Sequence, residues 1–93
     1  MEMTVSACEK ILLDVGINPA STIEYRINDE IRTVSLTWII ESFLRASEET
    51  KVLFVSSLDK IAKSGNPPAL KEYFENMGKL LILSAHPQSA PEV

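Results

Sequence analysis

The side chains that most often carry enzyme chemistry are few and scattered in this sequence. Cys8 is the only cysteine and His86 the only histidine. A nucleophilic cysteine needs a nearby base or positive charge to lower its pKa, but Cys8 lies among apolar residues at helical spacing, which is typical of a buried structural side chain. One cysteine and one histidine are also too few ligands for a structural zinc ion. We therefore predict no metal site and no catalytic cysteine or histidine.

Two acidic pairs are the remaining candidates for acid–base chemistry, Asp29-Glu30 and Glu48-Glu49. General acid–base catalysis requires carboxylates whose environments separate their pKa values. The first pair falls in a predicted turn and the second at the predicted start of a helix, and both positions favour acidic residues for local structural reasons. The three glycines are too far apart to form a phosphate-binding loop. The sequence therefore predicts a protein that is not an enzyme and that carries no cofactor.

The chain is mildly acidic, with 9 Lys and Arg residues against 13 Asp and Glu residues and a net charge of -4. Nucleic-acid-binding proteins usually carry clustered positive charge, because phosphate contacts supply much of their affinity, so we expect no nucleic-acid partner. No apolar run approaches the roughly 20 residues needed to span a bilayer, so we expect no membrane association. A single cysteine suits a reducing compartment, and the N-terminus does not resemble a signal peptide. Together these features predict a cytoplasmic location.

Hydrophobic periodicity predicts an α+β fold that is mostly α-helical, in which an N-terminal helix and one β-hairpin precede three helices. The first helix is expected from about Val5 to Val15, and Gly16 can end it. Apolar and polar residues then alternate in Thr22–Ile27, which indicates a half-buried strand. We expect this strand to pair with Glu30–Val34 across a turn at Asn28-Asp29, because both turn residues tolerate a left-handed backbone.

Three further helices are expected to pack with the first in a single compact domain of residues 1–85. The apolar stripes place them at about Leu36–Ala46, at Ser47–Ser64 and from Pro67 onward. Gly78 lies within the last helix, where it either lowers the stability of the helix or marks a break that is followed by a short strand at residues 79–83. Residues 86–93 contain two prolines and no apolar period, which predicts a flexible C-terminal tail.

Three apolar residues lie away from the stripes that their helices present to the core: Trp38, Ile82 and Leu83. One interpretation is that Trp38 packs under the hairpin and that the last helix occupies the middle of the core. The other is that the three residues form an exposed apolar patch of the kind that marks interfaces, with Trp38 as a hot spot. In that case the protein is a small interaction module, a regulator, adaptor or inhibitor, that docks on a partner protein or forms a homodimer.

A second functional hypothesis places a pocket between the hairpin and the helices of a small ligand-binding domain or enzyme. Tyr25, Arg26 and Arg32 are the polar residues of the predicted strands that are best suited to line it. A deep pocket lined by Tyr25 or Arg32 would favour ligand binding. A flat apolar patch around Trp38 or Leu83 would favour docking on a protein.

Overall fold

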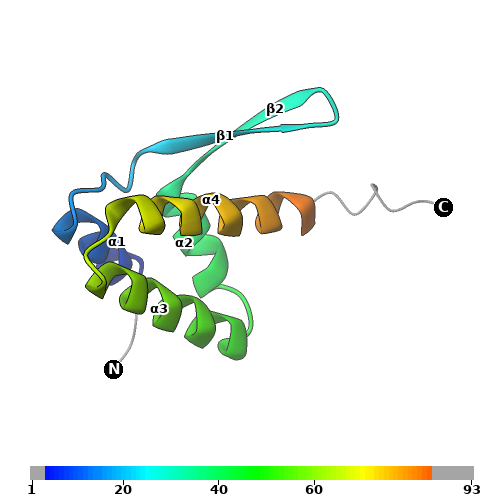
Figure 1. Ribbon diagram of the computed structural model, residues 1–93. Helices are drawn as coiled ribbons and strands as arrows, with labels where there is room; N and C mark the ends of the chain where they lie inside the picture. The colour runs from blue at the N-terminus through cyan, green and yellow to red at the C-terminus, as the bar shows by residue number, and fades with distance from the viewer. Residues whose placement is uncertain (1–3, 85–93) are drawn as a thin grey trace.

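The N-terminal segment forms helix α1, Val5–Asp14, in the computed structural model, which describes residues 4–84 (Figure 1). Thr4 is the N-cap of this helix, because its side-chain oxygen accepts a hydrogen bond of 3.1 Å from the Ala7 N–H. Gly16 follows the helix with a φ of 84°, a left-handed conformation that glycine adopts without steric cost. The predicted helix and its glycine end are both confirmed.

Strands β1, Thr22–Ile27, and β2, Glu30–Ser35, form an antiparallel hairpin. Asn28 and Asp29 connect them with φ values of 52° and 65°. Two consecutive left-handed residues are characteristic of the two-residue turn whose twist matches that of a hairpin. Side chains of β1 alternate between exposed and half-buried, so one face of this strand packs on the helices. The hairpin that the alternating pattern predicts is therefore confirmed.

Three helices complete the fold. They are α2 at Leu36–Leu44, α3 at Glu48–Lys63 and α4 at Pro67–Ser84. Ser35 and Ser47 cap α2 and α3, and their hydroxyl oxygens accept hydrogen bonds of 3.0 and 3.2 Å from a backbone N–H of the first helical turn. Helix α2 ends before the predicted Ala46, because the chain turns there to bring Ser47 into the extended conformation of a cap.

Helix α4 continues without interruption through Gly78, so residues 79–83 are helical and do not form the alternative strand. Gly78 is buried where β1 crosses the helix. The Tyr25 hydroxyl donates a hydrogen bond of 2.6 Å to the backbone carbonyl oxygen of Glu75, one turn earlier. A Cβ atom at position 78 would lie 2.9 Å from Ile39 Cδ1 and closer still to the Tyr25 hydroxyl. Glycine therefore lets the hairpin approach the helix backbone closely.

The core lies between the four helices, and α2 packs against each of the other three. Its buried side chains come from every helix and from the segment after α1: Cys8, Leu12, Ile17, Leu36, Ile39, Ile40, Phe54, Leu58, Leu70 and Phe74. Figure 1 shows α4 between the hairpin on one side and α3 on the other. The predicted order of one helix, a hairpin and three helices is confirmed.

The predicted flexible tail, residues 86–93, and its His86 lie outside the described residues. Within residues 4–84, no helix has both the length and the apolar composition needed to cross a membrane. The same stretch contains no group of three or more His, Cys, Asp or Glu side chains that is placed to hold a metal ion.

Candidate functional site

The structure places the three predicted partner-binding residues in different environments. Trp38 is half-buried and packs against the core. Ile82 is only 3% exposed, so its side chain offers almost no surface to a partner. Leu83, its neighbour in the sequence, is 45% exposed. The three residues therefore do not form one patch, and Leu83 alone of the three is exposed.

An apolar cleft, the α3–α4 cleft, lies where the first half of α3 meets the second half of α4. It has a volume of about 240 Å³. Its lining is mostly apolar and comes from three helices: Phe43, Thr50, Leu53, Phe54, Ser57, Tyr73, Met77 and Leu80. Leu53 on α3 is 63% exposed and Leu80 on α4 is 54% exposed. Two leucines from neighbouring helices thus expose apolar surface to solvent beside the α3–α4 cleft, and exposed apolar surface of this kind is typical of interaction sites.

The floor of the α3–α4 cleft is a cluster of aromatic rings. Phe54 is 3% exposed and stacks on Phe43, with the ring centroids 4.8 Å apart. The rings of Tyr73 and Phe74 lie 6.0 and 6.1 Å from the ring of Phe54. The Tyr73 hydroxyl also donates a hydrogen bond of 3.3 Å to the Phe54 carbonyl oxygen. These contacts hold the floor in place, so the cleft is preformed.

The chemistry of the α3–α4 cleft suits an apolar group. No charged side chain contributes to its lining. Burial raises the pKa of the Tyr73 phenol, and a hydrogen bond with Ser57 partly opposes this rise. The phenol is therefore neutral at physiological pH and acts as a hydrogen-bond donor. An aliphatic or aromatic side chain of a partner fits such a cleft better than a charged ligand does.

The stripe analysis of the sequence does not identify Leu53 and Leu80 as surface residues, although a signal for them is present. Each belongs to a run of four apolar residues, Val52–Val55 and Leu80–Leu83. Successive residues of a helix are about 100° apart, so a run of four covers most of its circumference. At least one side chain of each run must face solvent unless other elements surround the helix.

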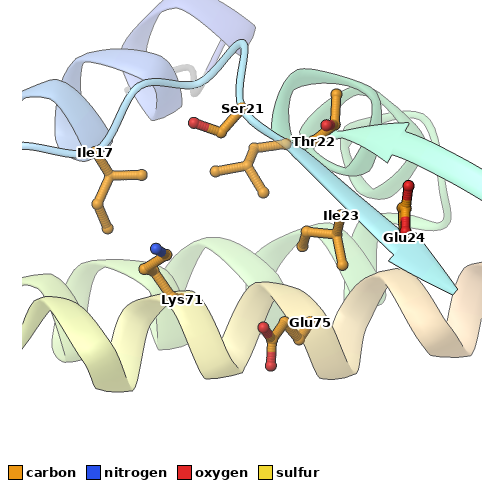
Figure 2. Close-up of a pocket in the computed structure, with 8 residues that line it drawn as sticks. Ile17, Ser21, Thr22, Ile23, Glu24, Lys71 and Glu75 are labelled. Atoms are coloured by element: carbon orange, nitrogen blue, oxygen red, sulfur yellow. The ribbon is translucent and has the colours of Figure 1, made fainter.

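Two more clefts lie between the hairpin and α4, where the second hypothesis expects a pocket. The first has a volume of about 490 Å³ and is lined by Ile17, Ser21, Thr22, Ile23, Glu24, Leu36, Lys71 and Glu75 (Figure 2). The second has a volume of about 430 Å³ and is lined by Ile23, Glu24, Tyr25, Arg26, Ile27, Glu75, Asn76 and Lys79. Both clefts combine acidic and basic side chains over an apolar strand face.

The predicted ligand-binding residues are divided between these clefts and the rest of the hairpin. Tyr25 and Arg26 line the second cleft, whereas Arg32 is the partner of Tyr25 in the strand register and lines neither cleft. The Tyr25 hydroxyl donates to the Glu75 carbonyl oxygen. Burial, and to a lesser extent the Glu75 charge, raises the pKa of Tyr25. Tyr25 thus attaches the hairpin to α4, and its hydroxyl proton is used in the hydrogen bond to Glu75.

Lys71 is the cation of the first hairpin cleft that is best placed for a ligand. Figure 2 shows its side chain reaching from α4 towards the segment that carries Ile17 and Ser21. Glu75 lies one turn later on α4 and lines the same cleft. Among the described residues, no acidic side chain forms an ion pair with Lys71. Buried Ile17 and Leu36 form an apolar wall of the same cleft.

Cys8 lies in the core and is 0% exposed. Burial, and to a lesser extent the charge of Glu9, raises the pKa of its thiol to about 11. The thiolate is the nucleophilic form of cysteine, and it is not populated at physiological pH with such a pKa. The interpretation of Cys8 as a buried structural side chain is confirmed.

The sequence matches no protein-family model, and neither the curated proteins nor the solved structures contain a significant match to it.

Proposed function

We propose that this protein is a non-enzymatic interaction module, a regulator, adaptor or inhibitor, whose α3–α4 cleft receives an apolar side chain of a partner protein. The observation that supports this most directly is the position of Leu53 and Leu80, more than half exposed on two sides of a preformed apolar cleft. Burying an exposed leucine contributes about 1.5–3 kcal/mol. The cleft and its leucines therefore offer an apolar pocket for an anchor side chain of the partner, as many protein interfaces do near their centre.

Leu83 extends this apolar surface along α4. It lies three residues after Leu80, so the two side chains are neighbours on the helix.

We propose a cytoplasmic location for this interaction module. Its single cysteine is buried as a free thiol, and a protein of this kind does not depend on an oxidising compartment.

Site-specific photo-cross-linking tests this proposal. A benzophenone amino acid replaces Leu53 in the full chain, which is expressed in its native host and irradiated. The same amino acid at Leu13 is the matched control, because Leu13 is 59% exposed on α1, away from the cleft. We expect a discrete protein adduct from position 53 that disappears when Leu80→Glu is added. Equal adducts from both positions, or none from position 53, would refute the proposal.

Ligand binding beneath the hairpin is the second candidate function. The position of Lys71, without an ion pair among residues 4–84 and beside an apolar wall, favours an organic ligand with an apolar body and a single anionic group. Glu24 and Glu75 line the same cleft and would repel further negative charge. A panel of small aliphatic and aromatic carboxylates tests this candidate by thermal unfolding. A rise in Tm that Lys71→Ala abolishes would support it, and an unchanged Tm across the panel would exclude this ligand class.

A further inference from the structure

One edge of α3 carries a charge pattern that is complementary to itself. Glu49, Leu53 and Lys60 are separated by four and seven residues, a spacing that places them along one side of the helix. All three side chains are exposed, and Leu53 lines the α3–α4 cleft. Within the described residues, neither Glu49 nor Lys60 forms an ion pair. They are eleven residues apart in the sequence, about 16.5 Å along the helix axis, so they cannot pair within one copy.

A second copy of α3, packed antiparallel on this edge, pairs both charges at once. In a two-fold dimer, residue i of one copy contacts residue j of the other, and the reverse contact follows by symmetry. If the axis passes midway between Glu49 and Lys60, close to Leu53, each Glu49 faces the Lys60 of the other copy. A parallel arrangement would instead place like charges side by side, which is unfavourable.

The same axis brings the exposed leucines together. Leu53 lies next to it, so the two copies of Leu53 meet at the centre of the contact. Leu80 lines the same cleft as Leu53, and Leu83 follows one helical turn later on α4. The leucines of both copies therefore form an apolar centre, and the Glu49–Lys60 pairs lie at its two ends. Interfaces commonly have this arrangement of an apolar core and a charged rim.

We infer that the partner of the α3–α4 cleft is a second copy of this chain, in a two-fold dimer with antiparallel α3 helices. This inference rests on the proposed function and names its partner. Leu13 on α1 and Ile31 on β2 are similarly exposed, but neither of them lines the cleft. They serve as matched controls for the leucines of the interface.

Sedimentation velocity over a wide range of protein concentrations tests the dimer. We expect a monomer–dimer equilibrium in the wild type, and Leu53→Glu should raise the dimer Kd by at least about tenfold. Leu13→Glu introduces the same charge at a similarly exposed leucine and should leave the Kd unchanged. A wild type that remains monomeric at every concentration, or an equal effect of both substitutions, would overturn the inference.

Charge reversal tests the antiparallel geometry without changing apolar residues. Each single variant, Glu49→Lys or Lys60→Glu, converts two attractive pairs of the dimer into two repulsive ones. Each should therefore raise the dimer Kd by about three- to tenfold. The double variant exchanges both charges and should restore the wild-type Kd. Additive weakening in the double variant would refute the antiparallel pairing. Both residues are exposed, and circular dichroism verifies that the variants fold.

The photo-cross-linking experiment separates this inference from the proposed function. An adduct of position 53 with a second copy of the chain supports both. A Leu80-dependent adduct with a different protein, together with a monomeric wild type, overturns the dimer and leaves the proposed function standing. A monomeric wild type without any adduct overturns both.

Discussion

Replacing Gly78 with alanine tests how the hairpin is held on α4. In an ordinary helix, this change is stabilising by about 1 kcal/mol, because alanine has the higher helix propensity. Here the new Cβ would lie 2.9 Å from Ile39 Cδ1 and even closer to the Tyr25 hydroxyl. Relief of this overpacking requires a shift of the hairpin or of the core, at a cost of about 1–3 kcal/mol.

Movement of Tyr25 has a second cost. Its hydrogen bond of 2.6 Å to the Glu75 carbonyl oxygen would be lost or lengthened, and such a bond contributes about 0.5–1.5 kcal/mol. We therefore expect Gly78→Ala to lower the free energy of unfolding by about 1–3 kcal/mol after the gain in helix propensity is included. Urea unfolding followed by far-ultraviolet circular dichroism measures this change.

A double-mutant cycle identifies the contact that is responsible. Tyr25→Phe removes the atom closest to the new Cβ and leaves the ring carbon Cζ at 3.2 Å. Gly78→Ala should therefore cost less in the Tyr25→Phe background than in the wild type, by at least about 0.5 kcal/mol of coupling. If Gly78→Ala stabilises the protein as in an isolated helix, or if the two substitutions are additive, Tyr25 does not determine the need for glycine.

The other predictions concern the core, the hairpin turn and the class of partner. Cys8 is 0% exposed and should react with a thiol reagent only through unfolding, so rapid labelling of the native protein would contradict its burial. Burial raises the pKa of Cys8 from 9.0 to about 11, so between these pH values the thiol ionises in the unfolded state but not in the folded state. The difference in free energy of unfolding between the wild type and Cys8→Ala should therefore be constant below pH 9 and should decline as the pH rises from 9 to about 11. Asn28→Ile should lower the free energy of unfolding by about 1–2 kcal/mol, because the φ of 52° at this position is left-handed; Asp29→Gly should be neutral or stabilising in the same urea titration. No binding to DNA or RNA is expected at physiological salt, and a mobility shift that weakens steeply with added salt would refute this.

The helices and the hairpin could be predicted from the sequence because their signals are local. Ser35 and Ser47 act as caps through backbone groups in the next helical turn, and Asn28 and Asp29 set the turn with their own dihedral angles. These interactions connect residues at most three positions apart, so a short stretch of sequence is enough to predict them.

The role of Gly78 could not be predicted, because it depends on a residue far away in the sequence. Tyr25 and Glu75 are separated by 50 positions, and only the packed structure shows that β1 crosses α4 at this glycine. Periodicity alone gives two open possibilities at Gly78, a weakened helix or a break. The tertiary contact selects the continuous helix and explains why it tolerates a residue of low propensity.

The exposure of individual apolar side chains could not be predicted from the hydrophobic periodicity either. Ile82 and Leu83 both lie off the main stripe of α4, yet Ile82 is 3% exposed and Leu83 is 45% exposed. The difference depends on which elements pack around the end of α4, and the sequence of α4 does not encode this. The apolar runs that contain Leu53 and Leu80 show that these helices carry more apolar residues than one buried face can hold. They do not show which side of each helix remains uncovered.

The position of the hairpin makes it a natural attachment point for a probe or a tether. Its two-residue turn at Asn28 and Asp29 is exposed, and β1 contacts α4 at Glu75 and Gly78, whereas the α3–α4 cleft uses Tyr73, Met77 and Leu80. Figure 1 shows the hairpin and α3 on different sides of α4, and the first set of residues contacts the hairpin whereas the second lines the cleft with α3. A fluorophore or a short peptide inserted at the turn, where exposed loop tips accept additions, would leave the cleft unobstructed. The protein could then be immobilised on a surface with its cleft facing the solution.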